Sequence, residues 1–343
     1  MRIAQIAPIV ERVPPKKYGG TERMVHALTE ELVRRGHEVT LFASGDSETS
    51  AKLEAVYPRS LREAKIKDMY GTNTWTLLNL GLAYEMQDEF DIIHDHLSPL
   101  SIPTANMATT PVVMTMHGPF TADNRALFQT LRTPYVVTIS ESQMYSLPNL
   151  NHMGTVYNGL PMEQYPFGEK VGDYLLYVGR IAQEKGVHVA IEVAQFLDLP
   201  LILAAKVDRY DLAYFREQIE PHLSDRIQWI GEVDEDERNK LMAGARCFLH
   251  PAQWREPFGL ALIEALACGC PVVAFDKGSI PEIVETGVTG YVVHDTETMI
   301  EAVQNIGAID RKKCREHALK NFSASKMTDG YEAVYKKILE KGV

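Results

Sequence analysis

Hydrophobic positions along this chain fall into two alternating patterns. Mostly apolar runs of strand length, such as residues 2–10 (RIAQIAPIV) and 111–116 (PVVMTM), are typical of strands buried on both faces. Segments with helical apolar spacing lie between them, and the one at residues 22–35 ends at Gly36, a good helix C-cap. This alternation predicts an α/β fold built on parallel sheets that helices cover on both faces.

The same patterns place further elements along the chain. We expect apolar strands at residues 37–44, 90–96, 135–142, 174–180, 200–206, 227–233, 247–252, 271–276 and 290–295. We expect helices at residues 59–68, 73–89, 99–108, 186–198, 210–223 and 234–244. Residues 59–68 are mildly basic and amphipathic, and a solvated helix face is favoured over a lipid-binding one.

Two domains are expected from the length and from one break in the pattern. A chain of 343 residues exceeds one ordinary core. Glycine, proline, asparagine and aspartate cluster near residues 160–172, which places a hinge there. We expect a doubly wound, Rossmann-like domain at residues 1–165, a second at residues 166–325 and a final helical segment at residues 326–343. Two such domains facing a cleft would bring the carboxyl ends of both sheets to one ligand site.

The most informative segment is residues 254–271 (WREPFGLALIEALACGCP). From residue 258 to residue 268 it is apolar on every side except at Glu264, which predicts a buried helix. Pro257 suits the first turn of that helix, and Gly269 suits its end. A carboxylate inside such a helix is costly unless it has a partner.

A second carboxylate, Glu256, precedes this helix and lies eight positions before Glu264. Their stems would be about 12 Å apart along the helix axis. Between them, the free N–H groups near Phe258, Gly259 and Leu260 would attract an anion. This arrangement favours a nucleotide diphosphate sugar, which has a charged middle and hydroxyl groups at both ends. The alternative is a structural Glu264 paired with an arginine.

Two loops after strands of the first half carry candidate residues. Gly19 and Gly20 precede a helix, where backbone N–H groups could approach a phosphate, although such a pair is often only a turn. His117 follows the strand at residues 111–116 and has the alternative of a helix-capping or core histidine.

Loops of the second half carry groups suited to a nucleotide and its phosphates. After the strand at residues 174–180, Arg180 and Lys185 could neutralise a diphosphate. The alternative is an exposed loop with a surface pair between Glu184 and Arg180. In residues 231–233 (GEV), the glycine permits close approach of a flat ring. Residues 234–238 (DEDER) are interpreted as a solvated helix start.

Composition narrows the function classes. A net charge of −11 argues against nucleic-acid binding, and no run reaches the roughly 18 apolar residues of a membrane span. The four cysteines form no CxxC motif and are expected to be reduced core thiols, which favours a cytoplasmic protein. The N-terminal residues are interpreted as a strand and not as a signal peptide. The run from His94 to His96 could bind a metal but lacks a third ligand nearby in the sequence, so no metal site is expected.

Together, these motifs resemble those of a known family, the retaining family 4 glycosyltransferases (glycosyl transferases group 1). Pieces in the family's order extend from about residue 1 to residue 295. They include YGGTERMV (18–25), HGPF (117–120), YVGRIAQEKG (177–186) and EPFGLALIEALACGCPVVAFD (256–276). The resemblance implies the GT-B fold of two Rossmann-like domains, with the last helix, at about residues 326–340, crossing back onto the first domain.

The resemblance also implies a role for each candidate residue. Glu264 would bind the ribose hydroxyls of the donor, and Glu256 would contact the transferred sugar near the reacting carbon. The backbone N–H groups of Phe258, Gly259 and Leu260 would meet the diphosphate and the sugar.

The remaining roles fall on four loops. Arg180 and Lys185, in the loop that begins at Gly179, would neutralise the departing diphosphate. The segment from Gly231 to Val233 would hold the base. In the first domain, the implied roles belong to the glycine pair Gly19–Gly20, which would approach the phosphates, and to His117, which would touch the donor sugar.

The resemblance implies a retaining hexosyltransferase, and the two cations at the diphosphate make a metal-independent reaction the expectation. The resemblance favours a UDP donor, and we expect glucose to be moved to an acceptor hydroxyl with no cofactor besides this substrate. The acceptor could be a small metabolite, a saccharide or a lipid-linked precursor. The alternatives are a nucleotide-sugar epimerase of the same two-domain shape and a catalytically silent nucleotide-sugar-binding protein.

Overall fold

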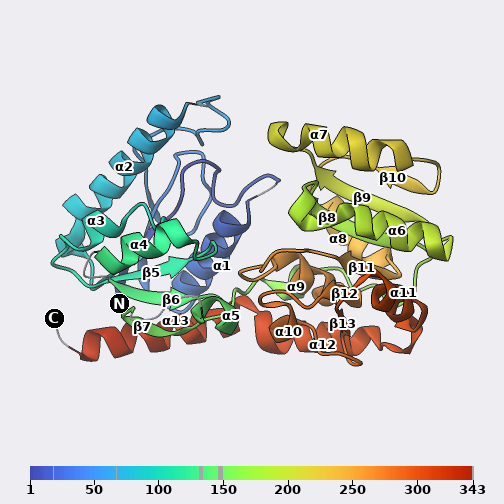
Figure 1. The fold of residues 1–343 in the computed structure, drawn as a ribbon. Helices are drawn as coiled ribbons and strands as arrows, with labels where there is room; N and C mark the ends of the chain where they lie inside the picture. Colours follow the sequence, from blue (N-terminus) through green and yellow to red (C-terminus); the bar gives the residue numbers. More distant parts are fainter. Residues whose placement is uncertain (18, 67, 131–133, 146–149, 342–343) are drawn as a thin grey trace. The chain divides into compact units, whose positions relative to one another are not determined.

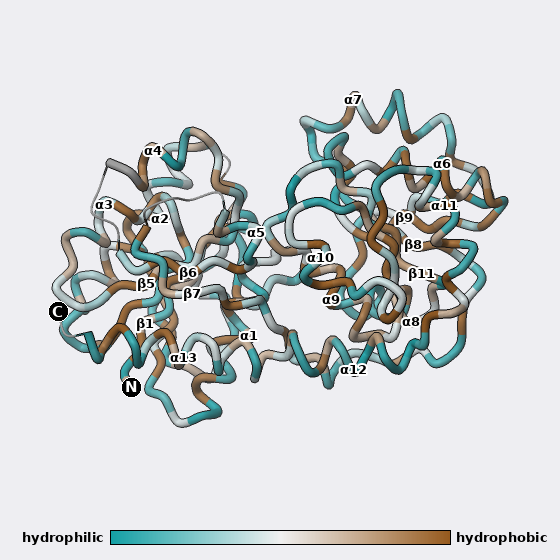
Figure 2. Tube along the Cα trace, turned by 60° about the horizontal axis from the view of Figure 1, so that its bottom comes forward, coloured by the Kyte–Doolittle hydropathy of each residue, from teal (hydrophilic) through white to brown (hydrophobic). Residues whose placement is uncertain are grey.

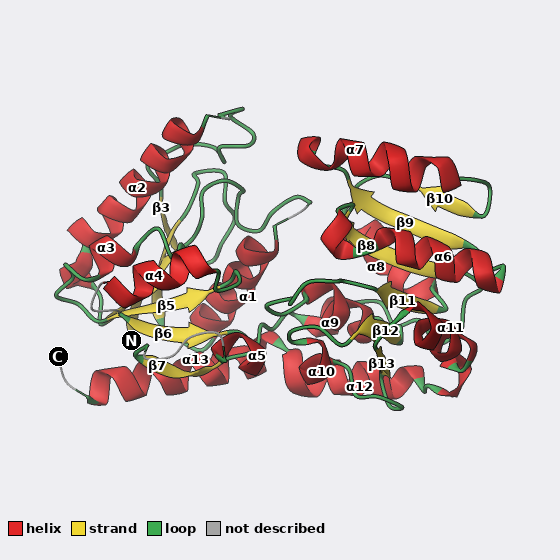
Figure 3. Cartoon of the chain, in the orientation of Figure 1, coloured by secondary structure: helices red, strands yellow, loops and turns green. Residues whose placement is uncertain are grey.

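A computed structural model describes residues 1–17, 19–66, 68–130, 134–145 and 150–341. The chain divides into two compact units, shown in Figure 1. The N-terminal unit contains Met1–Leu160 together with Ala324–Val343, and the C-terminal unit contains Pro161–Ser323. Each unit has its own parallel sheet between helices, as Figure 3 shows, which confirms the predicted α/β class.

The sheet of the N-terminal unit has the order β3-β2-β1-β4-β5-β6-β7 in the described part of the chain. Its strands are β1 (Arg2–Ile6), β2 (Glu38–Phe42), β3 (Lys52–Glu54), β4 (Ile92–Asp95), β5 (Val112–Met116), β6 (Tyr135–Thr138) and β7 (His152–Thr155). Its helices are α1 (Gly20–Arg34), α2 (Met69–Glu85), α3 (Ile102–Ala105), α4 (Ala122–Thr130), α5 (Glu141–Met144) and α13 (Ala324–Glu340). The strand order reverses between β1 and β4, which makes their carboxyl ends the switch point of this sheet.

The sheet of the C-terminal unit has the order β10-β9-β8-β11-β12-β13 and reverses between β8 and β11. Its strands are β8 (Leu175–Arg180), β9 (Leu201–Lys206), β10 (Ile227–Trp229), β11 (Cys247–His250), β12 (Val272–Phe275) and β13 (Gly290–Val293). Its helices are α6 (Val187–Leu197), α7 (Leu212–Tyr214), α8 (Glu235–Gly244), α9 (Leu260–Ala267), α10 (Ile280–Ile283), α11 (Thr296–Gln304) and α12 (Arg311–Phe322). Figure 2 shows hydrophobic residues along β8, β9 and β11, as expected for strands buried on both faces.

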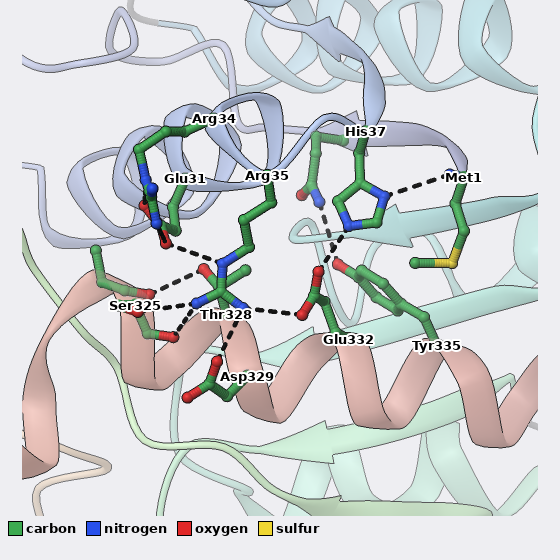
Figure 4. A network of polar contacts seen from close by, with 12 residues as sticks. Met1, Glu31, Arg34, Arg35, His37, Ser325, Thr328, Asp329, Glu332 and Tyr335 are labelled. Atoms are coloured by element: carbon green, nitrogen blue, oxygen red, sulfur yellow. Dashed lines mark hydrogen bonds and ion pairs between the residues drawn. The ribbon is translucent and has the colours of Figure 1, made fainter.

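The last helix, α13, belongs to the N-terminal unit, where it packs against α1 and β7. Figure 4 shows how Arg35, just after α1, joins the two helices. Its guanidinium lies 2.9 Å from Glu31 and 2.8 Å from both Asp329 and Glu332. Tyr331 and Tyr335 of α13 are fully buried.

Two helix predictions in the N-terminal unit need correction. Residues 61–65 form turns instead of the helix predicted at 59–68, because their backbone pairs with the loop after β1 and Lys65 has a positive φ of 59°. Residue 67 of that prediction lies outside the described residues. Helix α2 begins at Met69 and not at residue 73, since the Asp68 carboxylate caps it by accepting from the Gly71 N–H at 2.7 Å.

Two further helices are shorter or less regular than predicted. The helix expected at 99–108 is the single turn α3, which has Pro103 in its first positions. The helix expected at 210–223 consists of α7, a π-helical turn at Phe215–Ile219 and a 3₁₀ turn at Glu220–His222. Pro221 has no N–H to continue regular helical hydrogen bonding. Among the described residues, no helix combines the length and hydrophobicity needed to cross a membrane.

Candidate functional site

The carboxyl ends of β8 and β11 lie side by side, because these strands are parallel neighbours at the switch point of the C-terminal sheet. The loop after β8 contacts the loop after β11, where the Gln253 N–H donates to the Glu184 carbonyl at 2.8 Å. A Cβ added at Gly186 would lie 2.0 Å from the Pro251 carbonyl oxygen, so glycine is required for this close approach. In open α/β sheets, ligands bind at such a point.

These two loops join Lys185 and Glu256 in an ion pair. Lys185 Nζ contacts Glu256 Oε1 and also lies 4.7 Å from the ring centroid of Trp254. His250, the last residue of β11, places Nε2 3.5 Å from the same carboxylate oxygen. Burial raises the pKa of Glu256, but the interactions with His250 and Lys185 outweigh it and lower the pKa to about 2. Glu256 is therefore ionised at neutral pH.

Arg180, the last residue of β8, is held by two acidic side chains. Its Nη1 lies 2.6 Å from Asp211, and its Nη2 contacts Glu184, which is the pair considered as an alternative from the sequence. Partial burial lowers the pKa of Arg180, but the charges of Asp211 and Glu184 outweigh burial and raise the pKa above its usual value. The guanidinium therefore stays charged. Gly179 packs against the Tyr177 hydroxyl, which donates to the Arg180 carbonyl at 2.8 Å. A phosphate at Arg180 would thus compete with two carboxylates.

The loop after β12 fixes the segment that carries Glu256. Gly278 has φ 64°, and a Cβ there would lie 2.3 Å from the Glu256 carbonyl oxygen. The Ser279 N–H donates to that oxygen at 3.1 Å, and the Ser279 hydroxyl donates to the Phe258 carbonyl at 2.6 Å. Phe258 is buried and packs edge-to-face against Phe322. The backbone that carries the Glu256 side chain is therefore held by hydrogen bonds and close packing.

Helix α9 begins at Leu260, later than predicted. Gly259 is its N-cap with φ 99°, a conformation that favours glycine. Pro257 consequently lies in the loop before the helix and not in its first turn. The helix has no acidic residue in its first turn, so its N-terminal N–H groups and dipole can attract an anion.

Glu264 has the structural pairing that the sequence left open. It is buried, and its Oε1 lies 2.9 Å from Arg238 Nη2 and 3.2 Å from the Tyr165 hydroxyl. Arg238 belongs to α8, which Asp234 caps by accepting from the Glu237 N–H at 2.9 Å. The helix start is exposed as predicted, but Arg238 itself is buried and turns toward Glu264. The two glutamates therefore lie in different polar clusters.

The loop after β10 carries the residues expected near the base. Gly231 has φ 80°, and a Cβ added there would meet no atom of the described residues within 4 Å. Before it, the Trp229 indole N–H donates to the Ala205 carbonyl at 2.7 Å, which fixes the end of the strand. Glu232 and Val233 are partly exposed. Because β9 lies between β10 and β8, this loop is further along the same sheet edge than Arg180.

In the N-terminal unit, Gly19 caps α1 and Gly20 begins it. A Cβ added at Gly19 would lie 2.7 Å from the Pro15 side chain, so tight packing alone requires this glycine. Glu22 in the first turn was not recognised from the sequence. It is buried, and desolvation raises its pKa to about 7. An acidic residue among the apolar positions of a helix start was its only signal.

His117 follows β5 and is partly buried. Its Nε2 lies 3.0 Å from Nδ1 of the buried His96, and desolvation lowers the pKa of His117 to about 3, so the ring is neutral. His94 and His96 contact Gln5 of β1, and Asp95 accepts from the Leu97 N–H at 2.7 Å. Among the described residues, no group of three or more histidine, cysteine or acidic side chains is arranged to hold a metal ion.

Two buried polar residues were not singled out from the sequence, Gln5 in the N-terminal unit and His250 in the C-terminal unit. Gln5 interrupts the apolar strand β1, and His250 ends the buried strand β11. A polar residue inside a buried strand was the available signal. All four cysteines are buried and free, as predicted: Cys247, Cys268, Cys270 and Cys314.

Comparison with known families covers both units. Residues 18–164 match Glycosyltransferase Family 4, and residues 167–322 match Glycosyl transferases group 1. The chain is 24% identical to the N-acetyl-alpha-D-glucosaminyl L-malate synthase of Bacillus anthracis, over 94% of each chain. It is 26% identical to the phosphatidyl-myo-inositol mannosyltransferase of Mycolicibacterium smegmatis, over 92% of this chain and 86% of that protein.

The fold also matches solved structures. The Anabaena protein HepE, in complex with UDP and glucose, superimposes with a TM-score of 0.76 and 18% identity, over 98% of this chain and 100% of that one. The matched families, the two doubly wound units and the shared architecture agree with one another. The chain belongs to the family 4 glycosyltransferases, the glycosyl transferases group 1 with the GT-B fold, which use nucleotide-sugar donors.

Proposed function

We propose that this protein transfers a hexose, with glucose as the first candidate, from a UDP donor to an acceptor hydroxyl with retention of anomeric configuration. The observation that carries the proposal is the ion pair between Lys185 and Glu256 at the switch point of the C-terminal sheet. The pair lies at the loop that leads into α9, whose N-terminus favours an anion. A sugar diphosphate brings both an anion and hydroxyl groups to such a place.

In this proposal, the diphosphate takes Lys185 and Arg180 as its partners. Both cations are already held by carboxylates, so their positions are fixed before the donor binds. Preorganised charge of this kind stabilises the negative charge that develops on a leaving group. The bond between the anomeric carbon and the diphosphate oxygen breaks, and the acceptor oxygen bonds to the same face of that carbon. The acceptor proton passes to a phosphate oxygen.

In this proposal, Lys185 contacts the diphosphate while it stays paired with Glu256. A carboxylate can accept several hydrogen bonds, and His250 and Lys185 lower the pKa of Glu256, so it also accepts from a hydroxyl of the transferred sugar at neutral pH. Phe258, Gly259 and Leu260 would offer backbone N–H groups to the donor. Glu264 would accept the ribose hydroxyls while it keeps its contact with Arg238.

The remaining roles are also proposals. Gly231 to Val233 would hold the base, and Gly19 and Gly20 would approach the phosphates. His117 would contact the donor sugar as a neutral ring. Since two cations serve the diphosphate, we propose that no divalent metal is needed. A cytoplasmic location remains a prediction from the buried free thiols.

The relatives and a matched structure suggest which donor sugars to test. The two named relatives carry N-acetylglucosaminyl and mannosyl activities in their names, and the HepE complex holds UDP and glucose. A thermal-shift panel of UDP-glucose, UDP-N-acetylglucosamine, GDP-mannose and ADP-glucose tests the donor. We expect the largest stabilisation with UDP-glucose, and a larger shift with GDP-mannose would replace it.

Acceptor screening with the best donor then tests the reaction. We expect UDP release that depends on an acceptor and persists in EDTA. Conversion of the donor sugar without acceptor would favour an epimerase, and binding without turnover would favour a silent binding protein. Complete loss of activity in EDTA would contradict metal independence.

A further inference from the structure

A chain of buried hydrogen bonds in the N-terminal unit ends at His117. It contains Gln5 of β1, His96 after β4 and Tyr335 of α13, all almost fully buried. His117 Nε2 lies 3.0 Å from His96 Nδ1, and His96 Nε2 lies 2.7 Å from Gln5 Oε1. The Gln5 amide nitrogen donates in turn to the Tyr335 hydroxyl at 3.2 Å. The C-terminal helix is thus connected to His117 through three consecutive hydrogen bonds.

These contacts determine where the protons lie. An amide oxygen only accepts, so His96 must carry its proton on Nε2 to bond Gln5 Oε1. Burial lowers the pKa of His96 well below its usual value, so the ring is neutral and its Nδ1 is an acceptor. His117 must then donate from Nε2, which leaves Nδ1 of His117 with a lone pair.

A second branch agrees with this orientation of the Gln5 amide. Since the Gln5 amide nitrogen donates to the Tyr335 oxygen, the Tyr335 proton is available for His94 Nδ1, 2.6 Å away. His94 Nε2 then donates to the Thr115 hydroxyl at 2.8 Å.

We propose that His96 and Gln5 are positioning residues that hold His117 in the neutral Nε2–H form, so that its Nδ1 accepts a hydrogen bond from a hydroxyl of the donor sugar. This inference rests on the proposed contact between His117 and the sugar. A neutral ring suits that place, because a protonated imidazole of His117 would repel the positive charge that develops at the anomeric carbon. The residues act through His117 and do not themselves touch the donor.

Long-range ¹H–¹⁵N NMR of the full chain with labelled histidines tests the proton positions without any donor. Loss of signals in His117→Gln assigns the ring. We expect His117 to show a protonated Nε2 and an unprotonated Nδ1 between pH 6 and pH 8. The reverse tautomer, or a protonated ring, would overturn the proposal. The NMR measurement needs no glycosyl transfer, so it can fail or succeed independently of the proposed function.

Substitution of His96 tests the positioning. In His96→Phe, we expect mixed His117 tautomers and a fall in kcat of about tenfold, as for loss of one well-made hydrogen bond. In His96→Asn, the amide oxygen can occupy the place of Nδ1, so the single tautomer and most of kcat should return. His152→Phe is the matched control, because His152 of β7 also bonds a neighbouring side chain, Thr138, at 3.0 Å. An unchanged tautomer and kcat in His96→Phe would overturn the proposal.

Two tyrosines of α13 test whether the hydrogen-bond chain through Gln5, and not helix packing alone, acts on His117. The Tyr335 hydroxyl accepts a hydrogen bond from Gln5, whereas the Tyr331 hydroxyl bonds Thr115 at 2.9 Å. The Tyr331 ring also packs against the rings of His94 and Tyr335. Both are fully buried, so Tyr→Phe makes the same change in each. We expect Tyr335→Phe to broaden the tautomer distribution of His117, and Tyr331→Phe to leave it unchanged. Equal effects of the two variants would show that helix packing, and not the hydrogen-bond chain through Gln5, acts on His117.

Discussion

Lys185 and Glu256 stand 71 positions apart in the sequence, and the fold joins their side chains in one ion pair. Lys185 follows β8 and Glu256 follows β11, neighbouring strands at the point where the strand order reverses. Glu256 is buried and Lys185 is mostly buried, so water screens neither charge well. An anion that reaches Lys185 would therefore also interact with it strongly.

Removal of Lys185 should abolish most of the activity. In Lys185→Ala, we expect kcat to fall by about 10² to 10³, as for loss of one preorganised group at a developing charge. Lys206→Ala is the matched control, because Lys206 ends the neighbouring strand β9, pairs with Asp208 and has a similar side-chain exposure of 22% against 20%. Initial rates of UDP release measure both. Equal losses in the two variants would contradict the assignment of Lys185.

Glu256 should make stability depend on pH. Its pKa is lowered in the folded protein, to about 2 from an ordinary 4.5, so its contribution is fully present above pH 4.5 and disappears as the pH falls toward 2. The full contribution is about 3 kcal/mol. In Glu256→Gln, we expect a lower Tm than wild type at pH 7 and about half of that difference or less at pH 3.

Thermal melts at both pH values check this expectation. Glu169→Gln is the control, because Glu169 is 74% exposed and its nearest cation, on Lys312, lies 3.7 Å away. We expect this variant to match wild type at both pH values. A difference for Glu256→Gln that grows at acid pH would mean that the carboxylate is not held in its ionised form.

Variants of Glu264 and Arg238 should distinguish an effect on folding stability from an effect on donor binding. Arg238→Met leaves a buried carboxylate without its cation, and we expect destabilisation by about 3 to 5 kcal/mol. Glu264→Gln can still accept from Arg238 and Tyr165, so it should fold better but bind ribose less well. We expect a higher donor KM for Glu264→Gln, measured from donor saturation curves beside thermal melts. An unchanged donor KM in Glu264→Gln would make this glutamate purely structural.

Arg35 should hold α13 on the N-terminal unit. It bonds Asp329, Glu332 and the Ser325 carbonyl, whereas its neighbour Arg34 is 68% exposed and pairs with Glu31 alone in the described structure. In Arg35→Ala, we expect faster amide exchange throughout α13 and a loss of about 1 to 2 kcal/mol. Arg34→Ala should change neither quantity measurably. Equal exchange in the two variants would contradict this role.

The fold could be predicted from the sequence because apolar runs mark buried strands directly. The strand expected at 174–180 is β8 (Leu175–Arg180), and that at 247–252 contains β11 (Cys247–His250). Two short strands were not predicted, β3 (Lys52–Glu54) and β7 (His152–Thr155), because they have too few apolar residues to form a run. Periodicity also cannot locate caps such as Asp68, which starts α2 ahead of the predicted position.

The site could be predicted only at the level of loops. Strand order decides that the loop of Lys185 meets that of Glu256, and no local pattern encodes this contact. An arginine partner for Glu264 was foreseen, but Arg238 lies in a run of charges typical of a solvated face. The contact between His96 and Gln5 joins positions 91 residues apart, so only the tertiary fold reveals it.

The stereochemistry of transfer tests the central claim most directly. The protein is incubated with UDP-glucose labelled with ¹³C at the anomeric carbon and with a panel of sugar, polyol and hydroxy-acid acceptors, and ¹³C NMR follows the product. We predict release of UDP together with an α-linked glucoside, and a fall in the rate of both by about 10² to 10³ in Lys185→Ala. A β-linked product, or turnover at the wild-type rate in Lys185→Ala, would contradict the account.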